Sequence, residues 1–114
     1  MGMFVELSVR PGTGATLVTA VGDLDIATSP ELRRYLHAVL DEYAAALYVD
    51  VAAVQFIDSS ALGVLVSVYQ RLAGRGQRLT LVSPHERLRR TFRLTALDQV
   101  FTIVSALPAG PAAA

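Results

Sequence analysis

The hydrophobic and polar positions of this chain change period several times, and each change marks an expected element. Apolar and polar residues alternate over residues 4–9, which predicts a half-buried strand, and a Pro-Gly turn at 11–14 separates it from a second strand over 17–21. A connection this short joins antiparallel neighbours. We therefore expect a hairpin whose first strand lies at the edge of a sheet.

Three later segments have the spacing of amphipathic helices. The first begins at a capping box, Thr28-Ser29-Pro30-Glu31, and its apolar residues recur every three or four positions up to Tyr43. The second runs from about Ser60 to Ala73, with Gly74 expected as its C-terminal cap, and the third follows the cap-plus-proline segment Ser83-Pro84-His85-Glu86. Apolar strands are predicted beside these helices at 47–51, 79–82 and 101–104.

Helices that join successive strands require parallel neighbours, so the C-terminal ends of these strands share one edge of the sheet. The loops 23–28, 55–60 and 83–86 meet at that edge, which is where open parallel sheets hold their sites. The expected fold class is α/β: a mixed sheet of about five strands, with an N-terminal hairpin, a parallel βαβ core and helices packed on the sheet. We expect one domain over residues 1–107 and a disordered tail over the small, Pro/Gly-rich residues 108–114.

Composition narrows the classes of protein further. A length of 114 residues suits one domain with its own core, and no apolar run reaches the length of a membrane span. The N-terminal residues lack the pattern of a secretory signal, and the absence of cysteine excludes disulfides and thiol catalysis. These features predict a cytoplasmic protein that does not associate with membranes.

Charge is balanced overall but uneven along the chain. Three arginines stand against eight acidic residues up to Asp58, a balance of −5, and seven arginines against two acidic residues follow, a balance of +5. A chain without net basic charge lacks the field that collects phosphates, so we expect no direct nucleic-acid partner. The arginines at 87, 89, 90 and 93 are interpreted either as a solvated helix face or as a docking surface.

The residues offer little catalytic chemistry. Ser59, His85 and either Asp58 or Asp25 could approach one another at the shared edge, as a hydrolase would need, but no G-x-S-x-G motif supports that alternative. No P-loop, dinucleotide fingerprint or metal-ligand spacing is present. We therefore expect no enzyme activity, no cofactor and no metal site.

The strongest feature is Asp58-Ser59-Ser60, which closes a buried strand and opens the second helix. Asp and Ser are ordinary N-cap residues, and capping alone could explain them. A helix N-terminus also carries unpaired N–H groups and about half a positive charge, which favour a bound anion. A phosphoserine at this position would therefore be compatible with the fold.

The chain resembles the bacterial anti-sigma factor antagonists of the STAS superfamily. The resemblance covers about residues 4–104, and the motifs that carry it are Gly22-Asp23-Leu24-Asp25, the segment 58–64 (Asp-Ser-Ser-Ala-Leu-Gly-Val), 76–81 (Gly-Gln-Arg-Leu-Thr-Leu), Ser83-Pro84 and Leu97. It implies a partner switch in which the unphosphorylated antagonist binds an anti-sigma factor that is a serine kinase. Phosphorylation ends that binding, and a serine phosphatase restores it.

The resemblance also implies roles for particular residues. Ser59, directly after the aspartate, is the expected phosphorylation site, Ser60 matches the adjacent hydroxyl, and Asp25 matches a loop acid beside the site. Ala61 stands where many members have glycine. A scaffold in a stressosome or a transporter complex, without phosphorylation, is the alternative function. The expected partner-binding residues are Asp23, Asp25, Asp58, Ser59, Ser60, Leu62 and Ser83.

Overall fold

The structure, a computed structural model, describes residues 5–107 of the chain. Its elements follow the order β1 (Val5–Pro11), β2 (Ala15–Gly22), α1 (Ser29–Glu42), β3 (Ala46–Ala53), α2 (Ser59–Ala73), β4 (Leu79–Val82), α3 (Glu86–Leu94), the short 3-10 helix η1 (Leu97–Gln99) and β5 (Thr102–Val104). Phe4, the first residue of the predicted strand, lies outside the described residues. The expected tail at 108–114 lies outside them.

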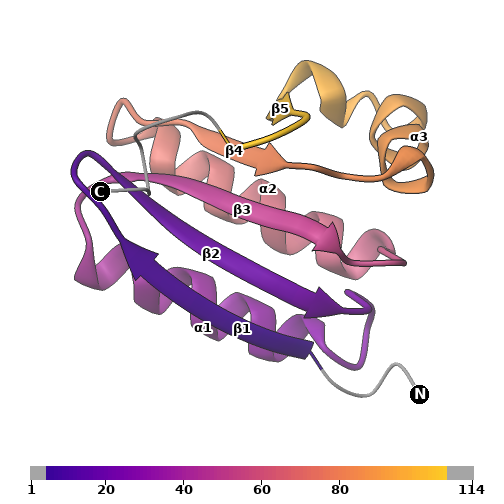
Figure 1. The fold of residues 1–114 in the computed structure, drawn as a ribbon, viewed down its shortest axis with the longest axis horizontal. Coiled ribbons are helices and arrows are strands. Elements are labelled where there is room, and N and C mark those ends of the chain that lie inside the picture. Colours follow the sequence, from indigo (N-terminus) through magenta and orange to yellow (C-terminus); the bar gives the residue numbers. More distant parts are fainter. Residues whose placement is uncertain (1–4, 108–114) are drawn as a thin grey trace.

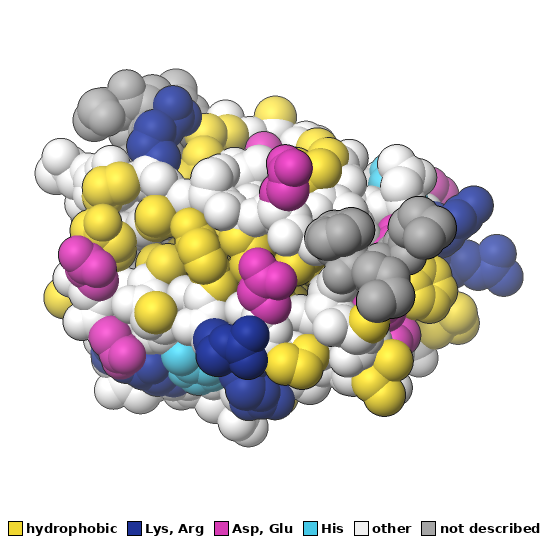
Figure 2. Space-filling view, turned by 90° about the horizontal axis from the view of Figure 1, so that it is seen from below, with side chains coloured by type: hydrophobic (Ala, Val, Ile, Leu, Met, Phe, Trp, Pro, Cys, Tyr) yellow, Lys and Arg dark blue, Asp and Glu magenta, His cyan; other side chains and the backbone are white. Residues whose placement is uncertain are grey.

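The predicted mixed sheet is confirmed. Its five strands follow the order β1-β2-β3-β4-β5, with β1 antiparallel to β2 and every later neighbour parallel. The hairpin therefore leaves β1 at an edge, as expected (Figure 1). Figure 2 views the molecule from the side of β1 and α1, where hydrophobic side chains gather between acidic and basic ones.

Helices α1 and α2 lie side by side behind the sheet (Figure 1). Alternate side chains of the strands point toward these helices, and the apolar stripes of the helices pack against them. Leu32, Leu36 and Leu40 of α1 are almost fully buried. The same holds for Leu65 and Leu72 of α2. This packing makes the start of α2 part of a rigid layer.

Two predicted helix starts differ in detail. Thr28 is the N-cap of α1, but its side chain makes no cap hydrogen bond, because the hydroxyl donates to the carbonyl of Asp23 (2.8 Å) and accepts from the amide of Asp25 (3.0 Å). The capping box predicted with Glu31 is therefore wrong, although Pro30 does lie in the first turn. The threonine closes the preceding loop instead.

The start of α3 is a second correction. His85 is its N-cap and accepts the amide of Arg87 through Nδ1 (3.2 Å). Ser83, expected as part of the cap, has a left-handed φ of 60° and donates its hydroxyl to the carbonyl of Ser105 (2.8 Å). At the end of α2, Gly74 is the C-cap, as predicted, and its backbone is right-handed. The glycine with left-handed backbone is Gly76, with a φ of 71°.

Candidate functional site

Two loops meet where β2 and β3 end. Residues Leu24 and Ile57 form an isolated parallel bridge, in which the amide of Leu24 donates to the carbonyl of Phe56 (2.9 Å) and the amide of Asp58 to the carbonyl of Leu24 (3.0 Å). The side chain of Leu24 is fully buried beneath them. The loop 23–28 is thus fixed against the start of α2, as the parallel topology predicts.

Asp58 joins the helix to the neighbouring loop. Its Oδ1 accepts the amides of Ser60 (2.9 Å) and Ala61 (3.2 Å), which makes it the N-cap of α2. Its Oδ2 accepts the amide of Ile26, 32 residues away in sequence (3.0 Å). One carboxylate therefore holds both the helix and the loop before α1.

These contacts change the acidity of Asp58. Desolvation by burial would raise the pKa of its carboxyl, but the hydrogen bonds from the Ser60 hydroxyl and from the amides of Ala61, Ser60 and Ile26 together lower it from its usual 3.8. The carboxylate is consequently ionised at neutral pH, directly beside Ser59.

The loop before α1 is held by its own polar groups. The Oδ1 atom of Asp25 accepts the amides of Ala27 (3.0 Å) and Thr28 (3.1 Å), and its carbonyl accepts the hydroxyl of Ser29 (2.6 Å). The same hydroxyl lies 3.1 Å from that of Ser60. This loop therefore has a defined shape before any partner arrives.

The two serines at the start of α2 have different surroundings. Ser60 is half-buried, and its hydroxyl donates to Oδ1 of Asp58 in addition to its contact with Ser29. Ser59 is exposed, and within residues 5–107 its hydroxyl has no hydrogen-bond partner. Of these two serines, Ser59 is the one with a hydroxyl free for another molecule.

The helix N-terminus is less open than the sequence suggested. Two of its first amides, those of Ser60 and Ala61, already donate to Asp58. An anion on Ser59 would therefore meet the helix dipole and the carboxylate of Asp58 together. The expected unpaired N–H groups are in large part occupied, so any favourable local effect of a phosphate is reduced.

Hydrophobic side chains that sequence reasoning did not single out flank Ser59. Ile26 is 78% exposed and Phe56 is 46% exposed, and each belongs to one of the two loops joined by the Leu24–Ile57 bridge. A shallow groove of about 360 Å³ lies between the starts of α1 and α2, and it is lined by Ile26, Ser29, Pro30, Arg33, Arg34, Ser60 and Val64. The sequence signal that could have identified Ile26 is its apolar side chain within an otherwise polar loop. Phe56 resembles a core residue in sequence.

The predicted site residues do not all gather. Asp23, Asp25, Asp58, Ser59 and Ser60 share the paired loops and the start of α2, as expected. Leu62 is only 7% exposed and packs in the core, so its expected partner contact does not fit its burial. Ser83 lies after β4, and its described hydrogen bonds run to the end of β5.

The hydrolase alternative finds no support in the positions of its residues. Within the described part of the chain no hydrogen bond joins Ser59 to a histidine, and Nδ1 of His85 is occupied as the cap of α3. No helix within residues 5–107 is long and apolar enough to span a membrane. No group of three potential metal ligands was found in the same region.

The arginine cluster of α3 divides into two kinds of residue. Arg89 donates to the carbonyl of Pro84 (3.2 Å) and to the hydroxyl of Ser105 (3.2 Å), and Arg93 pairs with Glu86 (2.6 Å). Arg87 and Arg90 are exposed, and the described residues provide their side chains with no ion-pair partner. Half of the cluster therefore supports the local structure.

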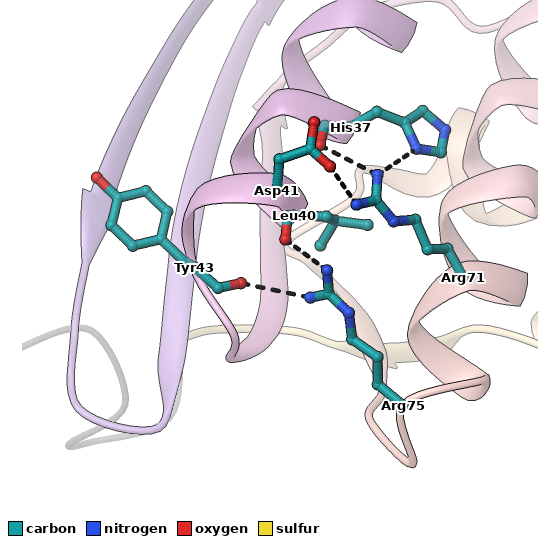
Figure 3. A network of polar contacts seen from close by, with 6 residues as sticks. All are labelled: His37, Leu40, Asp41, Tyr43, Arg71 and Arg75. Atoms are coloured by element: carbon teal, nitrogen blue, oxygen red, sulfur yellow. Dashed lines mark hydrogen bonds and ion pairs between the residues drawn. The ribbon is translucent and has the colours of Figure 1, made fainter.

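At the opposite end of the two helices from the site, a polar network joins α1 to α2 (Figure 3). Arg71 of α2 pairs with Asp41 and donates to the carbonyl of His37, and Arg75 donates to the carbonyls of Leu40 and Tyr43 at the end of α1. Cations at a helix C-terminus are favoured by its dipole. The network fixes the two helices whose starts form the site.

His37 takes part in this network as a neutral ring. An arginine can only donate, so Nδ1 of His37 accepts from Arg71 (3.1 Å) and Nε2 carries the proton that is donated to the hydroxyl of Ser67 (3.1 Å). Desolvation by burial lowers the pKa of His37 below its usual 6.5, and the charges of Arg71 and Arg33 lower it further, against the opposing effect of Asp41.

This lowered pKa predicts a pH dependence of folding. As the pH decreases below 6.5, His37 takes up a proton in the unfolded chain but not yet in the folded protein. The free energy of unfolding should therefore decrease with decreasing pH, until the pH passes the lower pKa of the folded state. Urea denaturation over this pH range measures the effect. The variant His37→Gln should lose the His37 part of the slope, and an identical slope in both proteins would contradict the role of the ring.

Comparisons with known proteins agree with this architecture. Residues 5–109 match the STAS domain family. The anti-sigma-B factor antagonist of Bacillus subtilis is 31% identical over 101 residues, which cover 89% of this chain and 92% of that protein. The crystal structure of an anti-sigma factor antagonist from Mycobacterium paratuberculosis has a TM-score of 0.85 at 28% identity, covering 94% of this chain and 91% of that one.

Two structures of SpoIIAA share the fold at lower identity. The anti-sigma factor antagonist SpoIIAA in its unphosphorylated form has a TM-score of 0.71 at 17% identity and covers 90% of each chain. The Bacillus protein in its phosphorylated form has a TM-score of 0.67 at 18% identity, covering 86% of this chain and 90% of that one. The chain therefore belongs to the STAS domain family, and the curated relatives that it matches over most of its length are anti-sigma factor antagonists.

Proposed function

We propose that this protein is an anti-sigma factor antagonist that acts by binding, with phosphorylation of Ser59 as its switch. The unphosphorylated protein binds an anti-sigma factor that is a serine kinase and thereby releases a sigma factor. Phosphate transfer to Ser59 ends that binding, and a serine phosphatase restores it. The observation that carries the proposal is the exposed, unbonded hydroxyl of Ser59 on a rigid helix start.

The electrostatic surroundings of Ser59 explain how such a switch works. A phosphate adds about −1.5 to −2 charges. Here it joins the ionised Asp58 and the nearby Asp25 at a surface that a partner must cover. Removing water from that charge, or placing it against like charge, weakens binding by several kcal/mol. The hydrophobic core beneath the site is not affected.

Phosphorylation in vitro tests the proposal. The protein would be incubated with ATP and the candidate anti-sigma factor kinases of its own organism, and the products mapped by mass spectrometry. We expect one phosphate, on Ser59, and none on Ser59→Ala. The matched control is Ser60→Ala, which removes the adjacent hydroxyl that Asp58 and Ser29 already engage and should still accept one phosphate. An unmodified wild-type chain would favour the scaffold alternative.

The partner surface is proposed to combine charge with apolar contact. Asp23, Asp25 and Asp58 supply negative charge, while Ile26 and Phe56 supply exposed apolar area beside Ser59. Exposed apolar residues surrounded by polar ones are typical of docking sites. A complementary partner would carry basic residues around an apolar centre.

Two changes separate these contributions. Ile26→Ser should weaken binding of the kinase about tenfold, because a largely exposed side chain is lost from the interface without loss of core packing. Raising the salt from low to moderate concentration should also weaken binding, since exposed charges are screened. Calorimetric titration measures both. Binding that depends on neither Ile26 nor salt would place the interface elsewhere on the molecule.

A further inference from the structure

The edge strand β1 presents an unpaired row of backbone groups. In the hairpin, the amide of Gly12 donates to the carbonyl of Ala15 (2.9 Å), and Arg10, Ser8 and Glu6 occupy the alternate positions of the ladder opposite Leu17, Thr19 and Val21. Hydrogen-bonded pairs alternate along an antiparallel ladder. These three residues therefore bond to β2, while Val5, Leu7, Val9 and Pro11 point their backbone groups away from the sheet.

Nothing within residues 5–107 pairs with these outward groups, because β1 has β2 as its one described neighbour. Such an edge is a template for another strand. The side chains of Glu6, Ser8 and Arg10 are exposed, whereas those of Leu7 and Val9 turn toward the helices and pack against the core. The edge thus has one charged face and one apolar face.

We propose that β1 pairs antiparallel with β1 of a second copy of this chain, around a two-fold axis at Ser8. In that register Leu7 lies opposite Val9 of the second copy, so outward backbone groups meet outward backbone groups. Glu6 lies opposite Arg10 of the second copy, and Arg10 opposite its Glu6. A two-fold interface must be self-complementary, and this strand is.

Charge selects this register among the possible ones. Shifting the axis to Leu7 or Val9 keeps the backbone pairing but removes both contacts between Glu6 and Arg10. In the proposed register these residues form the pairs without hydrogen bonds between them, where side chains approach most closely. Within the described residues neither Glu6 nor Arg10 has another ion-pair partner.

The apolar face also suits a second copy. A groove of about 180 Å³ runs between β1 and α1, lined by Val9, Tyr35, Ala38, Val39, Glu42 and Tyr43. Figure 2 views the molecule from the side of β1 and α1, and hydrophobic side chains gather on that side. Because Leu7 of the second copy would lie opposite Val9, its side chain would lie against this groove.

Charge-swapped variants test the pairing. Sedimentation equilibrium from micromolar to millimolar protein should show a monomer–dimer equilibrium. Glu6→Arg and Arg10→Glu each place like charges opposite one another and should raise the dissociation constant about tenfold, whereas an equimolar mixture should associate as the native chain does. Native protein that stays monomeric throughout, or a dimer that these variants leave unchanged, would overturn the proposal.

Amide hydrogen exchange gives a second readout at single residues. The amides of Leu7 and Val9 point away from β2 and should become protected as the protein concentration rises. The amide of Ser8 is bonded to β2 and serves as the internal control, because it should be protected at all concentrations. Exchange at Leu7 and Val9 that does not depend on concentration would contradict the pairing.

Discussion

The variant Ser59→Asp should bind the anti-sigma factor kinase proposed as its partner between about tenfold and a hundredfold more weakly than the native protein. The added charge lies beside the ionised Asp58, at the surface proposed to contact the partner. Folding should be spared. The side chain of Ser59 makes no described hydrogen bond that the change would break, and the helix dipole partly offsets repulsion from Asp58.

The measurement is a calorimetric or interferometric titration of the kinase with each variant. Ser59→Ala is the matched control, because it removes the hydroxyl without adding charge and should keep affinity close to that of the native protein. Urea denaturation should give free energies of unfolding within about 1 kcal/mol for all three proteins. Equal affinities for the alanine and aspartate variants would rule out a charge switch at this position.

Asp58→Ala should lower the free energy of unfolding by about 1.5 kcal/mol at neutral pH. The change removes the N-cap of α2 and the hydrogen bond to the amide of Ile26 at once. The midpoint of urea denaturation should fall with an unchanged slope. Because hydrogen bonds lower the pKa of Asp58 in the folded state, its stabilising effect should persist above pH 3.8 and disappear as the pH falls through the lower, folded value.

Asp58→Asn separates the two functions of this side chain. Asparagine remains a good N-cap, since its oxygen still accepts from Ser60 and Ala61, but its amide group then faces the donor at Ile26. We expect a smaller loss, of about 0.5 kcal/mol, together with faster hydrogen exchange at Ile26. If Asp58→Asn lowered the free energy of unfolding as much as Asp58→Ala does, the cap of α2 would not contribute more to stability than the hydrogen bond to Ile26.

Most of the architecture was predictable from sequence because it rests on periodicity. The alternation in β1 predicts a strand, the apolar stripes of α1 and α2 predict helices, and the short turn predicts a hairpin. The parallel topology then brings the C-terminal ends of the strands together. The place of Asp58, Ser59 and Ser60 between a strand and a helix was predictable for the same reason, whereas the choice of Ser59 as phosphorylation site comes from the resemblance and stays a prediction.

Details that depend on side-chain competition were not predictable. Thr28 could cap α1 or close the loop before it, and in the structure its hydroxyl bonds to the carbonyl of Asp23 and the amide of Asp25 and so closes the loop. Leu62 was expected to contact a partner although it lies on the apolar stripe of α2, and its burial follows that stripe. Phe56 reads as a core residue and is nearly half exposed, because the bridge at Leu24 and Ile57 turns it outward.

The polar network between α1 and α2 was also beyond sequence reasoning. Its members lie 30 or more residues apart, so no local pattern links Asp41 to Arg71 or Leu40 to Arg75. His37 belongs to the same network. Packing against α2 gives that ring its tautomer, its partners and its lowered pKa.

The most direct test compares the phosphorylated and unphosphorylated native protein in one titration against the anti-sigma factor kinase. Phosphate carries more charge than aspartate, so binding should weaken about a hundredfold or more when Ser59 is modified, and phosphatase treatment should restore it. Near-identical dissociation constants for the two forms, with Ser59 fully modified, would contradict the account.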